Sequence, residues 1–363
     1  ASNTAANYSN GNIDVNASGS PSQAITPNSL RFNSGAANTL TLTGSNAITT
    51  GGILVTSNVG NFASTITGGT IAGSASGDLT IVQNNTANTL TISSAIVNNV
   101  GATALTKAGP GTLVLSASNT FTGNIYLNGG TLVSAFASGT GGAFGTTAGT
   151  IYFQGNSTLQ LSGTSELLGK PLSFAAGVTG TVDTGNFAFT TGAVSGGGNL
   201  TKTGSGLLTL GSVTLTGGVT LAGGTIGSFN NLTSSNVVTV TASNGWLTGG
   251  GAAPIVLANT GTTSLVGNTM TYSGNISGTG AISFSPTAST HSNTLSGSNS
   301  FSGGVNVTQG ILGIGSPYAL GTGTLTLNNS AGLSTPNGAI TIATNNPQVW
   351  SGTISSPLSA DLN

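Results

Sequence analysis

One glycine-rich segment recurs three times in this chain, and this recurrence limits the fold more than any other feature. The clearest copy spans Leu105 to Leu132 and reads LTKAGPGTLVLSASNTFTGNIYLNGGTL. A second copy spans Leu200 to Ile226, and a looser third copy spans Asn293 to Leu312. Self-similarity of this kind indicates stacked repeats, in which each unit buries its apolar side against its neighbours. We therefore expect a solenoid.

The composition indicates an ordered chain with very little charge. The 363 residues include 4 Lys plus Arg and 5 Asp plus Glu, and 36% of the residues are hydrophobic. A disordered chain rich in Gly and Ser would lack this apolar content. Nucleic-acid binding requires several basic side chains that face phosphates, and this chain has too few of them. The sequence thus predicts a packed core and no nucleic-acid partner.

The low charge also favours self-association, because like-charge repulsion keeps many proteins apart in solution. Neither terminal segment of the sequence shows the amphipathic helix or charged strand that would cap an open sheet edge. We expect the chain to form a homo-oligomer or filament.

Cysteine is absent, which excludes disulfides and thiolate chemistry. The longest apolar run is about seven residues, far short of the roughly 20 that a membrane-spanning helix needs. We therefore expect no membrane-spanning segment. The chain starts in a polar stretch without the apolar core of a signal peptide, which predicts that a secretion signal has been removed.

Short alternations of aliphatic and hydroxyl residues predict many brief strands. The clearest are Thr39–Thr43, Thr89–Ile92, Thr112–Leu115, Val237–Val240 and Thr324–Leu327. Glycine is frequent enough to supply the turns and to disfavour helices. Asn-Gly and Asp-Gly hairpin turns are few, so parallel stacking is favoured over a β-sandwich. The predicted fold is all-β, a parallel β-helix of about 16 coils with almost no helix.

The three copies recur at an interval of roughly 90 residues, with no linker or compositional boundary between them. We expect residues 1–363 to form a single continuous solenoid with approximate long repeats 1–104, 105–199, 200–289 and 290–363. Asn119 and Asn299 each precede a Phe by two residues and are expected to form side-chain ladders. The predicted core residues of the clearest copy are Leu113, Leu115, Phe121, Ile125, Leu127 and Leu132.

Few residues could support catalysis. Sites that cleave glycans need two or three carboxylates close together, and the one grouping of interest is Glu166, Lys170 and Asp183. We interpret this grouping as a local surface ion pair. His291 has no Cys, Asp or second His near it, so neither a metal site nor a triad is expected. The sequence predicts a protein that is not an enzyme, with no catalytic, metal or cofactor-binding residues and no cofactor.

Thr-x-Thr strands on a flat solenoid can bind ice when their threonines form one regular array. The uneven spacing of Thr39, Thr89, Thr239 and Thr324 argues against such an array. Ordinary strand alternation explains these threonines.

The pattern LTKxGxGTLxLxxxNTFTGxxxLxGGTL, found from Leu105 to Leu132, resembles the autotransporter-associated β-strand repeat of long bacterial passenger proteins. The segment from Ser29 to Ile96 is also similar to stretches that precede this repeat in such proteins. The resemblance implies secretion to the cell surface or the extracellular space, a right-handed parallel β-helix and no catalytic residues. The third copy lacks a counterpart of Lys107 and Lys202, which indicates that the lysine is not required for folding.

Two functions fit these observations. The first is a structural solenoid that self-assembles into an extracellular fibre, stalk or sheath. The second is an adhesin passenger that binds glycans or other cells through a face rich in Ser, Thr and Asn. Exposed aromatic side chains in a shallow groove would favour the second function. The candidate contact residues are Tyr126, Tyr152, Trp246, Tyr272 and Trp350.

Overall fold

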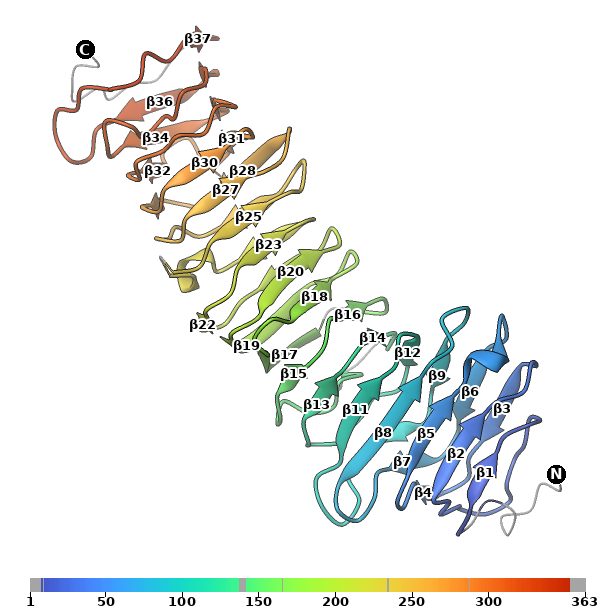
Figure 1. The fold of residues 1–363 in the computed structure, drawn as a ribbon. Helices are drawn as coiled ribbons and strands as arrows, with labels where there is room; N and C mark the ends of the chain where they lie inside the picture. Colours follow the sequence, from blue (N-terminus) through green and yellow to red (C-terminus); the bar gives the residue numbers. More distant parts are fainter. Residues whose placement is uncertain are drawn as a thin grey trace. The chain divides into compact units, whose positions relative to one another are not determined.

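The computed structural model describes Tyr8 and residues 10–136, 142–164, 166–233, 235–286 and 288–352. It is a parallel β-solenoid of about 16 turns with essentially no helix, which confirms the predicted fold class (Figure 1). The chain divides into two compact units, Ala1–Gly198 (unit 1) and Asn199–Asn363 (unit 2). A single continuous solenoid over 1–363 remains a prediction.

Unit 1 winds its coils through three parallel sheets, which we name A, B and C. Sheet A contains β1 (Asn12–Asp14), β2 (Ser29–Phe32), β5 (Gly52–Val55), β8 (Asp78–Gln83), β11 (Ala104–Ala108), β13 (Ile125–Leu127), β15 (Ile151–Phe153), β17 (Glu166–Phe174) and β19 (Phe189–Gly196). Sheet B contains β3 (Asn38–Thr41), β6 (Ser64–Thr67), β9 (Leu90–Ile92), β12 (Thr112–Leu115), β14 (Gly130–Ser134), β16 (Ser157–Leu161) and β18 (Thr179–Asp183). Sheet C contains β4 (Ser45–Ala47), β7 (Thr70–Ala72) and β10 (Ala95–Ile96), and a short 3-10 turn, η2 (Ser57–Val59), follows β5.

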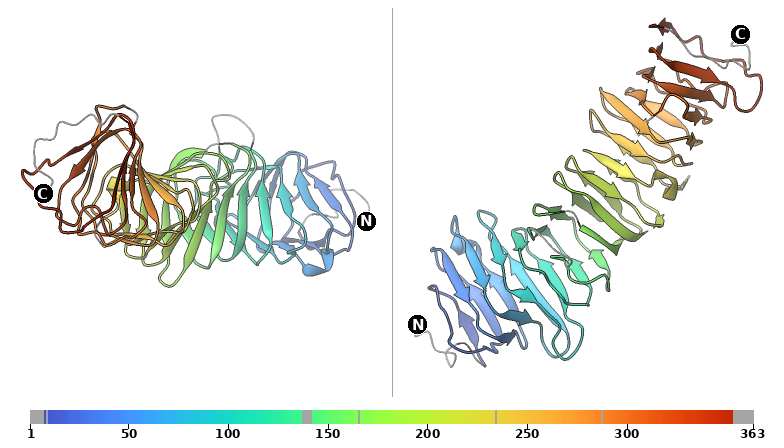
Figure 2. Two further views of the ribbon diagram at one scale, coloured as in Figure 1. Left: turned by 90° about the horizontal axis from the view of Figure 1, so that it is seen from above. Right: turned by 180° about the vertical axis from the view of Figure 1, so that it is seen from behind.

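Unit 2 is built in the same way from sheets that we name D, E and F (Figure 2). Sheet D contains β21 (Leu207–Thr209), β24 (Thr225–Gly227), β26 (Trp246–Thr248), β28 (Thr262–Val266), β31 (Ala281–Phe284), β33 (Val305–Val307), β35 (Leu325–Leu327) and β37 (Gln348–Trp350). Sheet E contains β20 (Asn199–Thr203), β23 (Val219–Leu221), β25 (Val238–Val240), β27 (Ile255–Leu257) and β30 (Ile276–Gly278). Sheet F contains β29 (Thr271–Tyr272), β32 (Ser292–Leu295), β34 (Gly310–Ile314) and β36 (Ala331–Ser334); β22 (Val213–Leu215) and a 3-10 turn, η3 (Phe229–Asn231), complete the unit.

Side chains alternate between the core and the surface along most strands, as a period of two requires. In β12, for example, Leu113 and Leu115 are buried, whereas Thr112 and Val114 are partly exposed. All six predicted core residues of the clearest copy are buried. The five strands predicted from sequence coincide with β3, β9, β12, β25 and β35, apart from one or two residues at their ends. Alternation therefore fixes which side chains pack inside.

Asn119 and Asn299 are buried, but they do not form the predicted side-chain ladders. The Asn119 Oδ1 atom accepts a hydrogen bond of 2.7 Å from the backbone N–H of Ile96, and its Nδ2 atom donates one of 2.5 Å to the carbonyl of Ala143. Asn299 does the same with Ile276 (2.8 Å) and Ala319 (2.7 Å). Each amide thus joins the backbones of the preceding and following coils. The N–H and carbonyl groups that these asparagines bind have to be paired because they are buried, and the side-chain amides supply the hydrogen bonds.

Lys107 and Lys202 lie inside the solenoid, each fully buried at an inward position of its strand. The Lys107 ammonium donates hydrogen bonds to the carbonyl oxygens of Ala108 (3.0 Å), Gly109 (2.8 Å) and Gly129 (3.0 Å). An ammonium has three donors and no acceptor, so this arrangement uses every donor. Gly129 belongs to the next coil, and the lysine therefore ties the turns of two adjacent coils together.

Lys202 repeats the same geometry in unit 2. Its Nζ atom donates to the carbonyl oxygens of Thr203 (2.6 Å), Gly204 (2.9 Å) and Gly223 (3.1 Å). In both copies, three residues that begin and end with glycine connect the lysine strand to the next strand. We call this arrangement the lysine clasp.

The coil that precedes the third copy has an apolar residue at the position that corresponds to the clasp lysine. Leu127 in the first copy corresponds to Val307 in the third. The ladder partners of these two residues in the preceding coil are Lys107 and Phe284. Phe284 is buried, and seven residues, 285–291, separate β31 from β32. The lysine thus occurs where a three-residue glycine turn follows the strand. Where the connection is longer, a buried phenylalanine occupies the same position.

Candidate ligand-contact surface

Two of the five candidate aromatic residues, Tyr126 and Tyr152, form a stacked pair on the outer surface of sheet A. They are ladder partners in β13 and β15, and their ring centroids are 5.2 Å apart with an interplanar angle of 14°. Asn124 donates a hydrogen bond of 3.1 Å to the Tyr126 hydroxyl and so holds that ring in place. Both rings are partly exposed. The pair therefore presents a rigid aromatic feature to solvent.

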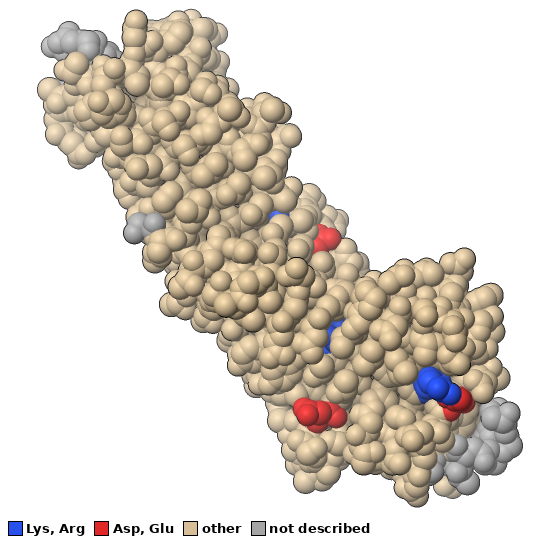
Figure 3. Space-filling view, in the orientation of Figure 1, with Lys and Arg blue, Asp and Glu red and all other residues tan. Residues whose placement is uncertain are grey.

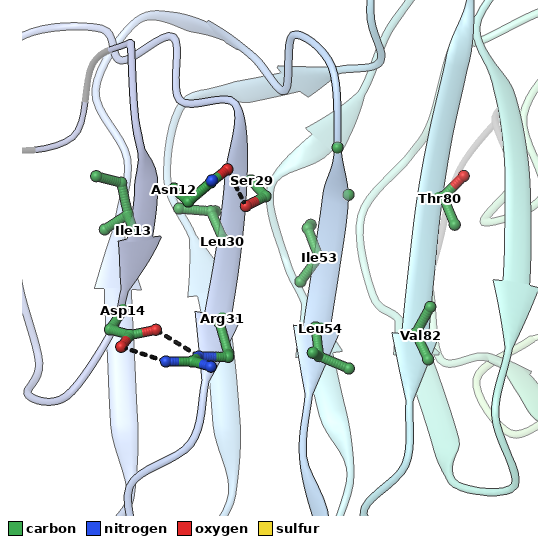
Figure 4. A pocket seen from close by; sticks show the side chains of 12 residues that line it. Asn12, Ile13, Asp14, Ser29, Leu30, Arg31, Ile53, Leu54, Thr80 and Val82 are labelled. Carbon is green, nitrogen blue, oxygen red and sulfur yellow. Dashed lines mark hydrogen bonds and ion pairs between the residues drawn. The ribbon is translucent and has the colours of Figure 1, made fainter.

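The same surface has a hollow of about 570 Å³ over β1, β2, β5 and β8 (Figure 4). Its floor lies at Gly51 and Gly52, which carry no side chains. A Cβ atom at Gly52 would collide with the carbonyl oxygen of Thr80, so the close approach of β8 requires glycine there. Leu54 and Val82 line one side of the hollow, and Ser29 lies beside its floor, where it donates a hydrogen bond of 2.8 Å to Asn12.

Asp14 and Arg31 form a bidentate ion pair at the edge of this hollow. The Arg31 Nε and Nη2 atoms donate to the two carboxylate oxygens of Asp14 over 2.5 and 2.6 Å. The hydrogen bond from Arg31 lowers the pKa of Asp14, and the same hydrogen bond raises the pKa of Arg31. Both side chains remain more than 40% exposed, so their free lone pairs and N–H groups face solvent.

Charge is scarce elsewhere on the view of the molecule that Figure 3 shows. All three lysines are buried, and Arg31 is the only Lys or Arg side chain among the described residues that reaches the surface. The described residues contain no grouping of three or more His, Asp or Glu side chains that could hold a metal ion.

Small side chains separate the ion pair from the tyrosine pair. Ladder register places Thr80 beside Thr106, and Thr106 beside Tyr126, in one outward row. The neighbouring row runs from Arg31 through Leu54 and Val82 to Ala108. We define the sheet A surface as the outward residues Asp14, Arg31, Leu54, Thr80, Val82, Thr106, Ala108, Tyr126 and Tyr152.

The other three candidate aromatic residues have different surroundings. Trp246 in unit 2 is 46% exposed between Thr225 and Ser264, its ladder partners in sheet D. Trp350 is 53% exposed, but its ladder partner is the inward residue Leu327. Trp350 therefore occupies a core position that no further coil covers within the described residues.

The interpretation of Tyr272 as a ligand-contact residue is wrong, because its side chain is only 1% exposed. The ring packs 5.9 Å from Phe229 in the core, and burial raises the pKa of the hydroxyl. That hydroxyl has no hydrogen-bond partner among the described residues. Tyr272 is a core residue and is not available to a ligand.

The predicted surface ion pair at Lys170 is also wrong for the described side chains. Lys170 is buried, and its Nζ atom donates a hydrogen bond to the carbonyl oxygen of Ala148. Asp183 instead accepts hydrogen bonds from Gln160 (2.8 Å) and from the backbone N–H of Gly185 (2.9 Å). The side chain of Glu166 lies outside the described part of the chain.

Threonines do align on the outer face of sheet B, although their sequence spacing is uneven. Coils of different length bring them into register, because ladder partners in adjacent coils are 17 to 28 positions apart. One row contains Thr39, Thr65 and Thr91, and a second contains Thr112, Thr131, Thr158 and Thr181. Uneven spacing in the sequence therefore does not prevent regular rows of threonine on this sheet.

Sequence reasoning missed the Asp14–Arg31 pair and its hollow. These two residues are 17 positions apart, and only the length of the first coil makes them ladder partners. The available signal was the alternation in each strand, which places both side chains outward. In the sequence, Gly51 and Gly52 indicated only a turn and not the floor of a hollow.

The three sequence copies match a known family model, described as passenger-associated-transport-repeat, at residues 105–133, 200–226 and 294–314. The chain is also 28% identical over 267 residues to a protein named Adhesin BmaC autotransporter from Brucella suis biovar 1 (strain 1330). This similarity covers 64% of the present chain and 7% of that protein.

No solved structure is significantly similar to this chain. Among the described residues, no helix has the length and apolarity needed to span a membrane. The family match confirms the repeat that the sequence pattern indicated. The chain is thus a parallel β-solenoid that carries three passenger-associated-transport repeats.

Proposed function

We propose that this chain is a non-catalytic adhesin segment, displayed at the cell surface or in the extracellular space, that contacts its partner through an outer face of the solenoid. The passenger-associated-transport repeats support an exported solenoid, and the similarity to an autotransporter adhesin supports attachment. The stacked Tyr126–Tyr152 pair carries the proposal. Two outward rings side by side are unusual on a surface otherwise made of small side chains, and contact surfaces are enriched in tyrosine.

Flow cytometry of fluorescently labelled chain on cultured epithelial cells and on yeast cells tests this function. Saturable binding that unlabelled chain displaces is the expected result. Labelled serum albumin provides the background. Binding to neither cell type above that background would contradict the proposal.

A second function, self-assembly into a fibre or sheath, has support from Trp350. This residue has an inward register, as its partner Leu327 does, and is nevertheless 53% exposed. A further coil stacked on β37 would bury it, and in a fibre that coil would belong to another copy. Electron microscopy across protein concentration and salt distinguishes the two functions, because assembly without charge should be insensitive to ionic strength. Filaments at all salt concentrations support assembly, and isolated short particles oppose it.

A further inference from the structure

The sheet A surface has two prominent ends and a low floor between them. The Asp14–Arg31 pair stands at one end, and the Tyr126–Tyr152 pair stands at the other. Four strand-to-strand steps, from β2 through β5, β8 and β11 to β13, separate Arg31 from Tyr126. At about 4.8 Å per step this distance is about 19 Å. A ligand that touches both ends is therefore extended and lies along the direction of coil stacking.

The floor favours a ligand with both apolar and hydroxyl groups. Leu54, Val82 and Ala108 form one row of aliphatic side chains, and Thr80 and Thr106 form a parallel row of hydroxyl side chains. Gly52 continues the threonine row and deepens it into the hollow. A pyranose ring has the matching character, because its C–H groups are apolar and its hydroxyls lie at its rim.

The charges favour an uncharged ligand. Arg31 and Asp14 neutralise each other, and the next exposed charge on this sheet is the carboxylate of Asp78 at the start of β8. An anionic sugar would meet a net negative surface. A neutral sugar would use the free guanidinium N–H groups and carboxylate lone pairs of the pair as hydrogen-bond partners.

We propose that the sheet A surface binds a linear, uncharged polysaccharide along the stacking direction, with its pyranose rings between the Asp14–Arg31 pair and the outer face of the tyrosine pair. The advance per ring in an extended β-1,4-linked chain is close to the spacing between strands, so successive rings lie over successive strands of the sheet. This inference rests on the proposed adhesin function and names its ligand class.

Isothermal titration of the full chain with uncharged β-1,4-linked hexamers of glucose, mannose and N-acetylglucosamine tests the proposal. We expect at least one hexamer to bind. Tyr126→Ala and Arg31→Gln should each weaken that binding about tenfold, since a stacked ring or a charged hydrogen bond contributes on this scale. The hexamer of β-1,4-linked glucuronic acid should bind at least tenfold more weakly. Tyr318→Ala, which removes an exposed tyrosine of unit 2, serves as the matched control and should leave binding unchanged.

Two results would overturn the inference. One is the absence of binding by all three uncharged hexamers to a chain whose circular dichroism shows the β-solenoid. The other is binding that Tyr126→Ala and Arg31→Gln leave unchanged. If cells bind the chain in either of these cases, the adhesin function stands and only the ligand class fails. If a hexamer binds as expected and cells do not, the function fails and the ligand site stands.

Discussion

The ammonium of Lys107 donates a hydrogen bond of 3.0 Å to the carbonyl oxygen of Gly129 in the next coil. Gly130, which follows, has a positive φ of 67°, and a Cβ atom there would lie 2.8 Å from the lysine Nζ. Glycine is therefore required at position 130 by the nearby lysine as well as by the turn conformation. A buried cation without an acidic partner is normally unfavourable, and here backbone carbonyls supply the compensating dipoles.

Removal of the lysine clasp should destabilise unit 1. Lys107→Ala leaves three buried carbonyls without a donor and a cavity in the core, so we expect a loss of about 3 kcal/mol. Lys107→Met refills the volume and should lose less. Urea unfolding followed by circular dichroism measures both. Thr106→Ala, on the adjacent outward position, should stay within about 0.5 kcal/mol of the parent. Equal effects of Lys107→Ala and Thr106→Ala would refute the clasp.

Alkaline pH should stabilise the fold over a defined window. Burial lowers the pKa of Lys107 and of Lys170 to about 8, from the usual 10.5 of lysine. Between these values the unfolded chain binds more protons than the folded chain, so the free energy of unfolding should rise with pH. Below pH 8 these lysines contribute no slope.

Tyr272 gives the opposite slope at higher pH, because burial raises the pKa of its hydroxyl. The clearest measurement is therefore unfolding in urea between pH 8 and about 10, the usual pKa of tyrosine. Lys107→Met should flatten part of the rise. A free energy of unfolding that falls over this window in the parent chain would contradict the assignment.

The asparagine bridge at Asn119 should control local opening. Asn119→Ala removes the acceptor of the Ile96 N–H and the donor to the Ala143 carbonyl. We expect a loss of about 2 kcal/mol and a matching loss of hydrogen-exchange protection at the Ile96 amide. Asn119→Asp retains the acceptor but buries a carboxylate beside the Ala143 carbonyl, so it should lose at least as much stability as the alanine variant. Unchanged exchange at Ile96 in the alanine variant would show that the bridge is not needed.

A lysine should be poorly tolerated at Phe284, which corresponds to the clasp lysine in the coil before the third copy. Phe284 is buried and precedes a seven-residue connection, not a three-residue glycine turn. Phe284→Lys would bury an ammonium without three carbonyls arranged around it, and we expect a cost of about 3 kcal/mol. Phe284→Leu should cost less, because it stays apolar. Thermal unfolding compares the two variants, and a lysine variant as stable as the leucine variant would contradict the link between clasp and turn.

The Asp14–Arg31 pair should matter little for folding. Both side chains are exposed to solvent, where ion pairs contribute weakly. Asp14→Asn and Arg31→Gln should therefore unfold at the same urea concentration as the parent. A large shift in either variant would show that the pair is structural and would disqualify these variants as probes of ligand binding.

The sequence was sufficient to predict the architecture, because repeats and strand alternation are local signals. The same alternation places Lys107 inward, between Leu105 and the glycine turn, yet a lysine is ordinarily read as a surface residue. One of the three carbonyls that make its burial acceptable, that of Gly129, belongs to a turn 22 residues away. Local patterns contain no information about such a partner.

The candidate surface was less predictable, because it depends on register between coils of unequal length. Tyr126 and Tyr152 are ladder partners only because the intervening coil has 26 residues, and Arg31 meets Asp14 across a coil of 17. Tyr272 and Trp350 were also misplaced for this reason. Both have inward positions in their strands, which residue type alone does not indicate. Coil lengths, not residue types, decide which side chains share a row.

The most direct test of the adhesin function is the retention, under shear flow, of beads coated with the purified chain on a layer of epithelial cells. We predict that coated beads remain attached to cells, stay separate from one another and are displaced by soluble chain. Albumin-coated beads should wash away. Beads that adhere to one another and not to cells would contradict the adhesin function and would favour a self-assembling fibre.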